Sequence, residues 1–202
     1  TGKHTLLIHK KAGSFFVLGE LFTSLELPFD EPTTKHCGSC TACIDICPTH
    51  AIVEPYMLDA RKCIAYLTIE YQGIIPEELR RGIGNRVFGC DDCQLICPWN
   101  SFAQKTEITD FHPRHQLDDI TLVELWQWNE NTFLACTEGS PLRRTGYQSF
   151  MRNIAIGLGN APFSEHILQQ LEQKRAEHDE IVQVHIDWAI QEQLSKKATI
   201  LI

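Results

Sequence analysis

Cysteines are the residues of this chain whose types and spacing indicate chemistry. They fall in two runs, CGSCTACIDICP and CDDCQLICP: the first places Cys37, Cys40, Cys43 and Cys47, and the second places Cys90, Cys93 and Cys97. The first run has the spacing C-x2-C-x2-C-x3-C-P, by which bacterial-type ferredoxins hold [4Fe–4S] clusters, and the cysteine before the proline ligates the other cluster. The two runs together therefore predict two [4Fe–4S] clusters.

A ligand count extends this prediction. Two clusters need eight thiolates, the runs supply seven, and Cys63 lies between the runs and completes the set. The assignment for cluster A is Cys37, Cys40, Cys43 and Cys97. The assignment for cluster B is Cys47, Cys63, Cys90 and Cys93. Of the nine cysteines, Cys136 is left over, and we interpret it as a buried structural thiol.

Two other uses of the cysteines fit less well. Structural zinc sites use four ligands, commonly as two C-x2-C pairs, whereas the first run is a triple C-x2-C-x2-C. A disulfide framework requires an oxidising compartment, and the N-terminus shows no charged n-region, apolar h-region or cleavage site. We therefore expect a cytoplasmic metalloprotein.

Composition bounds the remaining function classes. The chain has 202 residues, 43% hydrophobic and 22% charged, and a formal charge of −8. It has no apolar run near the ~20 residues that a transmembrane helix needs, so we expect no membrane association. Because the net charge is acidic, any nucleic-acid binding must come from local basic patches.

The segment before the cysteines is β-prone. Residues 5–9 and 15–21 are predicted to form a hairpin around a turn at residues 10–14 (KKAGS). A two-stranded hairpin is marginally stable on its own, so we expect it to belong to a larger sheet. The chain also begins at Thr1 without a methionine, and we interpret it as a fragment that lacks an N-terminal partner sequence.

Shorter elements are expected within the cluster region. Residues 49–53 and 64–71 have strand character, and residues 87–89 are expected to be extended. A helix is predicted to begin at Pro76, because proline suits the first turn and the acids that follow suit the helix dipole.

The half of the chain after Pro98 is predicted to be helical. Thr121 and Glu124 form a capping box, and a short helix is expected over residues 131–136. A longer helix is expected to begin at Pro141 and to end at Gly159-Asn160, with further helices capped by Ser164 and Asp179. Successive short amphipathic helices indicate a HEAT-like domain; an ordinary small helical bundle is the alternative.

These flanking segments bear on function. Paired clusters form a path for electrons, and ordinary two-cluster ferredoxins are short. A β segment before the clusters and a helical half after them favour a reductase over a free electron carrier.

The combination resembles a known family. GKHTLLIHKKAGSFFVLGE, the two cysteine runs with their flanks (CGSCTACIDICPTHAI and CDDCQLICPWN), RKCIAYLTIE and SPLRRTGYQSFMRNIAIGLGN are similar to epoxyqueuosine reductase. The resemblance covers nearly the whole chain but not the N-terminal half of the family. It implies an α+β protein of three parts: the end of an α/β cobalamin-binding domain at 1–36, a two-cluster ferredoxin-like domain at 37–100 and a HEAT-like domain at 101–202.

The resemblance also implies an activity. The family reduces epoxyqueuosine to queuosine at the wobble position of tRNAs for Tyr, His, Asp and Asn, with electrons passing from a low-potential donor through two [4Fe–4S] clusters to cobalamin. An aspartate proposed as the proton donor lies in the part of the family that this chain does not match, so no catalytic residue is assigned here. We expect a monomer.

Candidate cobalamin contacts follow from this implied domain. Thr5 and Leu7 share one face of the first predicted strand, Leu18 lies on the second, and Ala65 is small enough to let a corrin edge approach cluster B. A core role for these four residues is the alternative. His4 and His9 are favoured as surface or capping residues over cobalt ligands.

Two arginine groups are candidate tRNA contacts. Arginine binds phosphate through a bidentate fork, and the groups are Arg80, Arg81 and Arg86, and Arg143, Arg144 and Arg152. Solvated helix faces or pairing with Glu77, Glu78 and Glu138 would explain them equally. Two rival functions remain at this point: a corrinoid reductive dehalogenase-like enzyme and a stand-alone iron–sulfur electron-transfer module.

Overall fold

The computed structural model describes residues 1–33 and 36–200. Its contacts divide the chain into two compact units. The first unit comprises Thr1–Asp59 and Asp91–Glu107; the second comprises Ala60–Cys90 and the chain from Ile108 onward. Among the described residues no helix is both long and apolar enough to cross a membrane.

The first unit carries few regular elements. They are α1 (Ala42–Asp45), β1 (Ile52–Glu54), β2 (Met57–Leu58), α4 (Asp92–Leu95) and the 3-10 helix η2 (Pro98–Phe102). Strands β1 and β2 pair antiparallel with Ile52 opposite Leu58, and helices α1 and α4 pack against each other. Few apolar side chains are buried in this unit. Among its described residues, the buried hydrophobic ones are Cys43, Ala51 and Ile52.

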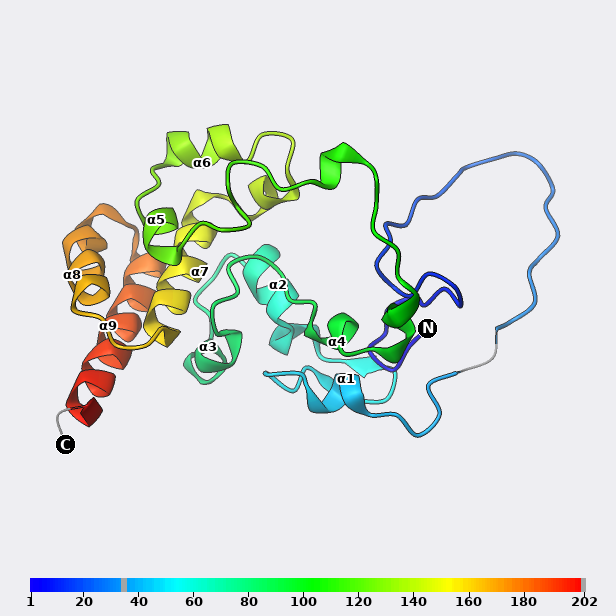
Figure 1. Cartoon of the computed structure of the whole chain (residues 1–202), viewed down its shortest axis with the longest axis horizontal. Helices are drawn as coiled ribbons and strands as arrows, with labels where there is room; N and C mark the ends of the chain where they lie inside the picture. The colour runs from blue at the N-terminus through cyan, green and yellow to red at the C-terminus, as the bar shows by residue number, and fades with distance from the viewer. Residues whose placement is uncertain (34–35, 201–202) are drawn as a thin grey trace. The chain divides into compact units, whose positions relative to one another are not determined.

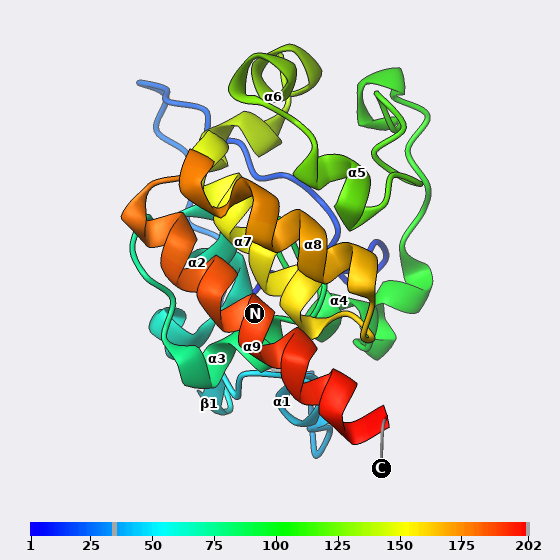
Figure 2. The same ribbon diagram turned by 90° about the vertical axis from the view of Figure 1, so that its left-hand side faces the viewer.

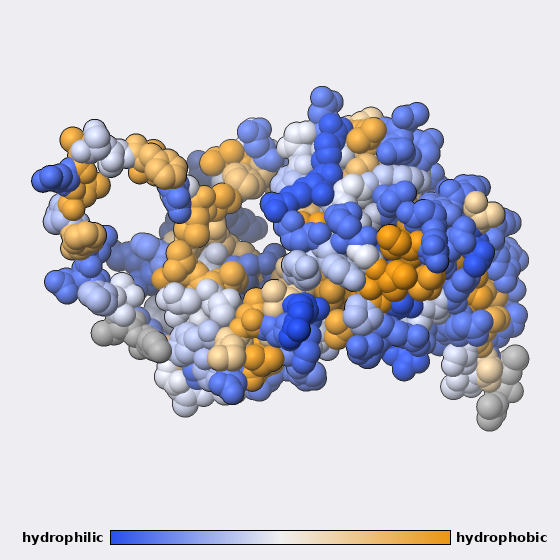
Figure 3. All heavy atoms as spheres, turned by 180° about the vertical axis from the view of Figure 1, so that it is seen from behind, coloured by the Kyte–Doolittle hydropathy of each residue, from blue (hydrophilic) through white to orange (hydrophobic). Residues whose placement is uncertain are grey.

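The N-terminal hairpin predicted at residues 5–21 does not form strands. The turn exists, since the His9 N–H donates to Gly13 O and the Gly13 N–H donates back to His9 O. Beyond it, Leu21 and Phe22 are 97% and 95% exposed. Figure 3 shows hydrophobic side chains along the loop at its left, which is the segment between residues 15 and 33. Two strands with no further sheet to pair with gain too little to form.

The second unit is helical and contains the main hydrophobic core. Figures 1 and 2 show α7 and α9 side by side, with α8 beside α9. Its α-helices are α2 (Ile64–Ile69), α3 (Glu77–Ile83), α5 (Leu122–Trp126), α6 (Glu130–Cys136), α7 (Tyr147–Asn160), α8 (Glu165–Lys174) and α9 (Glu180–Ile200). Its 3-10 helices are η1 (Ala60–Lys62), η3 (Thr109–Phe111), η4 (Pro141–Thr145) and η5 (Arg175–Glu177).

Most predicted helix starts are confirmed. Thr121 and Glu124 form the expected capping box, and Ser164 accepts from the Ile167 N–H at the start of α8. The Asp179 carboxylate accepts from the Val182 N–H at the start of α9. The helix expected from Pro141 is instead divided, because Gly146 has φ +74° and separates η4 from α7.

A further predicted strand, at residues 64–71, is also wrong. Residues 64–69 form helix α2, and a turn follows at Glu70. Ile64, Leu67 and Thr68 are buried, which is the i, i+3, i+4 period of a helix face and not the alternation of a strand. The β-branched and aromatic content of IAYLTIEY suggested the wrong element, because packing on α7 decides the conformation.

Candidate iron–sulfur site

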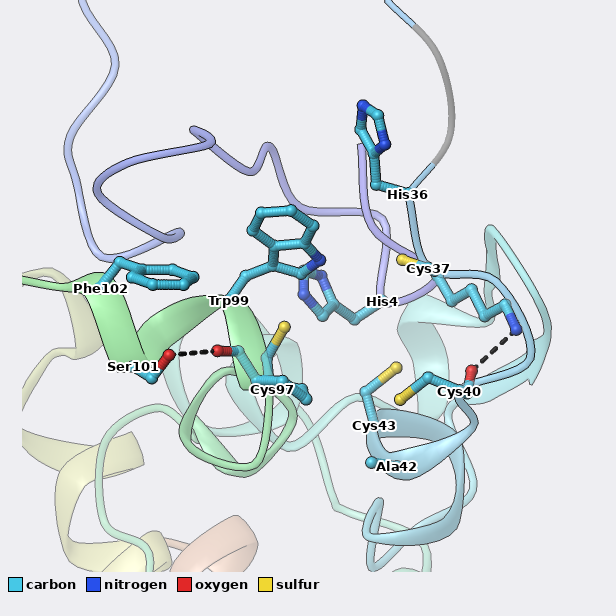
Figure 4. A pocket seen from close by; sticks show the side chains of 12 residues that line it. His4, His36, Cys37, Cys40, Ala42, Cys43, Cys97, Trp99, Ser101 and Phe102 are labelled. Atoms are coloured by element: carbon cyan, nitrogen blue, oxygen red, sulfur yellow. Dashed lines mark hydrogen bonds between the residues drawn. The ribbon is translucent and has the colours of Figure 1, made fainter.

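Four cysteines of the first unit line one cavity of about 540 Å³. They are Cys37, Cys40, Cys43 and Cys97, the set assigned to cluster A. Figure 4 shows their sulfur atoms directed into the same space, with Trp99 beside it. Cys97 comes from the second cysteine run, so the fold brings the last cysteine of one run to the first three of the other.

The two cysteine runs adopt the same local structure. Thr41 (φ −121°, ψ 5°) and Asp91 (φ −113°, ψ 15°) precede α1 and α4, and Ile46 and Ile96 end them with nearly identical angles. Cys40 thus corresponds to Cys90, Cys43 to Cys93 and Cys47 to Cys97. The position equivalent to Cys37 in the second run is Val87, which explains why a cysteine from elsewhere is needed there.

One thiol of this cavity, that of Cys43, has a raised pKa. Burial raises the pKa of Cys43, the neighbouring Cys97, Cys37 and Cys40 thiols raise it further, and a backbone hydrogen bond opposes them. Thiolates are the form of cysteine that binds iron, and a bound metal offsets the cost of a buried negative charge. The donor set therefore fits an iron–sulfur cluster.

The cavity suits a cluster rather than a single ion. Within the part of the chain that the structure describes, no group of three His, Cys, Asp or Glu side chains is spaced to hold one metal ion. The cysteine pattern, C-x2-C-x2-C-x3-C-P, is the one by which [4Fe–4S] clusters are held.

The cysteines assigned to cluster B belong to both units. Cys47 and Cys93 lie in the first unit, and Cys63 and Cys90 lie in the second. The Cys47 sulfur accepts a hydrogen bond of 3.3 Å from the Ala51 N–H. Cys63 immediately precedes α2 in an extended conformation (φ −69°, ψ 123°), nearly the same as that of Cys97 before η2. Cys136 ends α6 in the second unit.

The sequence did not single out two residues that line the cavity, Lys3 and Trp99, and it favoured a surface or capping place for a third, His4. The buried Lys3 ammonium donates to Gly38 O (2.8 Å) and Cys40 O (2.7 Å). His4 is buried, its Nδ1 accepts from the Leu6 N–H, and its Nε2 has no hydrogen-bond partner. Burial lowers the pKa of His4. The position of Trp99 directly after Cys97-Pro98 was the feature of the sequence that could have placed it beside the cavity.

The N-terminal turn is fixed to the second cysteine run. The Ser14 N–H donates to Asn100 Oδ1 at 2.6 Å, and Asn100 Nδ2 donates to Gln94 O at 2.6 Å. Gly13 has φ +74°, and a Cβ there would overlap the Asn100 amide. A second cavity of about 520 Å³ lies along this turn, lined in part by His9, Lys10 and Lys11.

The predicted cobalamin contacts are dispersed. Leu7 and Leu18 are 47% and 66% exposed, and Thr5 lies in a turn with φ +71°. Neither of the two cavities counts Thr5, Leu7 or Leu18 among its lining residues. Ala65 belongs to the second unit, in the first turn of α2.

The six arginines divide into buried and surface residues. Arg80 is buried and donates to Ile75 O at 2.9 Å, and Arg152 has no exposed surface. Both guanidiniums donate to backbone carbonyls in this structure, and their expected role in phosphate binding stays a prediction. Arg81 and Arg144 lie at the surface and pair with Glu192 and Glu70, each at 2.8 Å. Arg143 is exposed, and Arg86 is partly buried.

Fold and site define an iron–sulfur protein of the two-cluster class, and comparison with known proteins agrees. Residues 36–100 match the family model of the 4Fe-4S double cluster binding domain. The chain is 59% identical over 189 residues to the epoxyqueuosine reductase of Xanthomonas campestris pv. campestris, covering 94% of this chain and 53% of that protein. The chain is thus similar to the C-terminal part of epoxyqueuosine reductase.

Solved structures show the same relationship. The epoxyqueuosine reductase of Streptococcus thermophilus has a TM-score of 0.84 and 28% identity, over 96% of this chain and 51% of that chain. An epoxyqueuosine reductase crystallised with an epoxyqueuosine-modified tRNA-Tyr stem loop has a TM-score of 0.72 and 24% identity, over 96% of this chain and 60% of that chain. The latter likeness shows the fold alone. This chain spans about half the length of the curated relatives it matches.

Proposed function

We propose that this chain is the cluster-bearing part of an enzyme that reduces epoxyqueuosine to queuosine in tRNA. The observation that carries the proposal is the convergence of four cysteines on one cavity, in a chain 59% identical to an epoxyqueuosine reductase over 94% of its length. The rival functions, a corrinoid dehalogenase and a separate electron carrier, have no comparable support among these relatives.

The proposal includes a ligand assignment. Cys37, Cys40, Cys43 and Cys97 would hold cluster A, and Cys47, Cys63, Cys90 and Cys93 would hold cluster B. The buried Lys3 donates to the carbonyl of Cys40, and Trp99 lines the cavity proposed for cluster A. When bound, the clusters supply one-electron transfer, and cobalamin supplies a low-valent cobalt that reduces the epoxide.

The remaining assignments are also proposals. The cobalamin group would contact the N-terminal segment, through Thr5, Leu7 and Leu18, and Ala65 of α2. Exposure of Leu7 and Leu18 supports this, because apolar side chains at the surface favour a partner group. We also propose that the chain is divided into parts at 1–36, 37–100 and 101–202, the last of them HEAT-like, as the resemblance to the family implies.

The tRNA surface is proposed on the second unit. Of the six arginines, the exposed Arg81, Arg143 and Arg144 and the partly buried Arg86 are retained. A relative of the same fold was crystallised with a tRNA stem loop, which supports nucleic acid as the partner. We place the base to be reduced in a single-stranded loop, because a base inside a helix is not accessible to such chemistry.

One experiment tests the proposal. The native protein is purified anaerobically, its iron, sulfide and corrin are measured, and turnover is assayed on epoxyqueuosine-containing tRNA. We expect about eight irons per chain, as two [4Fe–4S] clusters require, one corrin and formation of queuosine. About four irons would contradict the two-cluster assignment. A full iron load without corrin or turnover would instead indicate a stand-alone electron-transfer module.

A further inference from the structure

A single buried hydroxyl joins the neighbours of two cysteines in the second unit. Thr68 has no exposed surface; its Oγ1 donates to Ile64 O at 2.6 Å and accepts from the Gly89 N–H at 2.9 Å. Ile64 directly follows Cys63, and Gly89 directly precedes Cys90. The hydroxyl thus connects the backbone beside Cys63 to the backbone beside Cys90.

The backbone at Gly89 is specific to this connection. Gly89 has φ +74°, a conformation that residues with a Cβ adopt only with strain. Gly89, the residue before Cys90, adopts this conformation while its N–H donates to the Thr68 hydroxyl. The glycine is therefore required by its dihedral angle, since a Cβ there would meet only Ile69, at an ordinary contact distance of 3.7 Å.

Helix α7 links the same two segments a second time. Asn153, which is fully buried, donates through Nδ2 to Thr68 O at 2.8 Å and to Val87 O at 2.9 Å. One acceptor belongs to α2, which follows Cys63, and the other lies in the segment that leads to Cys90. The amide oxygen of Asn153 accepts from the Arg152 guanidinium at 3.0 and 3.1 Å, which fixes the amide orientation.

Arg152 completes the network at the other end of α2. Its guanidinium donates to Leu67 O, Tyr71 O and Gly73 O at 2.7–2.9 Å, which satisfies carbonyls at and after the C-terminus of that helix. A cation is favourable there because the C-terminus carries the negative end of the helix dipole. Burial lowers the pKa of Arg152 to about 10, so the group keeps its charge at neutral pH.

We propose that Thr68, Asn153 and Arg152 are positioning residues that fix the separation of Cys63 and Cys90 as ligands of cluster B. The inference rests on the ligand assignment in the proposed function. Groups that hydrogen-bond around metal ligands set ligand orientation and tune the metal centre. A network that merely packed α7 against its neighbours would leave cluster B insensitive to loss of one hydroxyl.

The test uses a matched pair of buried threonines. Thr68→Val removes the hydroxyl and keeps the shape, and Thr68→Ser restores a hydroxyl. Thr137→Val is the control, because Thr137 is equally buried and its hydroxyl donates to Phe133 O at the same 2.6 Å, whereas its segment carries none of the eight assigned cysteines. The native protein and each variant are reconstituted anaerobically; iron per chain, the electron paramagnetic resonance signals of the reduced clusters and their midpoint potentials are measured.

We expect Thr68→Val to lose one of two cluster signals, with iron falling from about eight to about four per chain, or to shift the midpoint potential of one cluster only. Thr68→Ser and Thr137→Val should match the wild type. The proposal is overturned if Thr68→Val retains both clusters at unchanged potentials, or if Thr137→Val loses a cluster to the same extent. A wild type with only about four irons would overturn the ligand assignment itself, and the inference with it.

A second pair covers the case in which Thr68→Val does not fold. Asn153→Asp loses both donations but keeps the oxygen that faces Arg152. Asn160→Asp, in the same helix, loses donations to Arg80 O and Gly84 O at 2.8 and 3.0 Å, which lie away from the cysteines in the chain. Selective loss of one cluster signal in Asn153→Asp supports the proposal, and equal spectra for the two variants overturn it.

Discussion

The ammonium group of Lys3 donates a hydrogen bond of 2.7 Å to the carbonyl oxygen of Cys40. The same group donates to Gly38 O at 2.8 Å, so one buried lysine orders the loop that carries two cysteines of the first run. Gly38 has φ +49°, and within this loop the Cys40 N–H donates to Cys37 O at 3.0 Å. The N-terminal segment is therefore a structural support of the cavity assigned to cluster A.

Replacement of Lys3 by methionine tests this support. Lys3→Met keeps the apolar stem but removes the ammonium that donates to the Gly38 and Cys40 carbonyls. We expect faster loss of iron from one cluster when a chelator is added. Lys11→Met, at an exposed position of the same segment, is the control. Equal rates of iron release from the two variants would contradict the role given to Lys3.

The buried cation Arg152 allows a test of stability. Arg152→Met leaves three backbone carbonyls and the Asn153 oxygen without their donor. At about 1–3 kcal/mol for each unsatisfied buried group, we expect the free energy of unfolding to fall by at least ~3 kcal/mol. Arg143→Met, at an exposed position, should change it by less than about 0.5 kcal/mol. Denaturant unfolding of both variants measures the difference, and comparable midpoints would show that Arg152 is not a structural residue.

The cysteine spacing was sufficient to predict the cavity of cluster A. Ligand spacing follows from the chemistry of a cubane, and it tolerates little variation. Helix caps were equally predictable at Thr121, Ser164 and Asp179, because a cap depends on local hydrogen bonds.

Other features depended on tertiary contacts that the sequence does not display. Arg80 and Arg152 look like surface charges in the sequence. Arg80 instead donates to the carbonyl of Ile75, just before its own helix, and Arg152 donates to carbonyls more than 80 residues away along the chain. The sequence of residues 64–71 indicated a strand because of its β-branched and aromatic residues, whereas Ile64, Leu67 and Thr68 are buried on one face of a helix. Lys3 was missed because its two acceptors are backbone atoms.

The surface arginines give a prediction on tRNA binding. Arg144→Gln should weaken binding of a tRNA anticodon stem loop and lower the slope of log K against log[salt] by about 1, as loss of one phosphate contact does. Arg175→Gln is the control, because Arg175 is also a surface residue in an ion pair, with Asp187, but lies outside both arginine groups. Binding is measured by fluorescence anisotropy at several salt concentrations. The surface is misassigned if the two variants bind alike.

The buried His185 gives a prediction on pH. Its Nε2 accepts from the Ile75 N–H at 3.1 Å, and its Nδ1 lies 2.7 Å from Ile181 O, so the ring is neutral in the folded protein. Burial lowers the pKa of His185 from 6.5 to about 4; the hydrogen bond to Ile181 opposes this, and the Arg80 and Arg152 guanidiniums add to it. Both arginines keep their charge throughout the acidic range, so they do not titrate there.

The sign of the effect follows from linkage. The unfolded chain binds a proton at His185 below pH 6.5, whereas the folded protein does so only near pH 4, so stability is retained above pH 6.5 and is lost as the pH falls toward 4. The shift corresponds to about 3 kcal/mol over this window. In His185→Gln, which keeps an oxygen to accept from Ile75, the free energy of unfolding should fall less steeply over the same window. The burial of His4 and His178 also lowers their pKa values, so part of the acid sensitivity should persist in the variant. Denaturant titrations of both proteins from pH 7 to pH 4 measure the slopes, and parallel curves would mean that the pKa of His185 is the same in the folded and the unfolded chain.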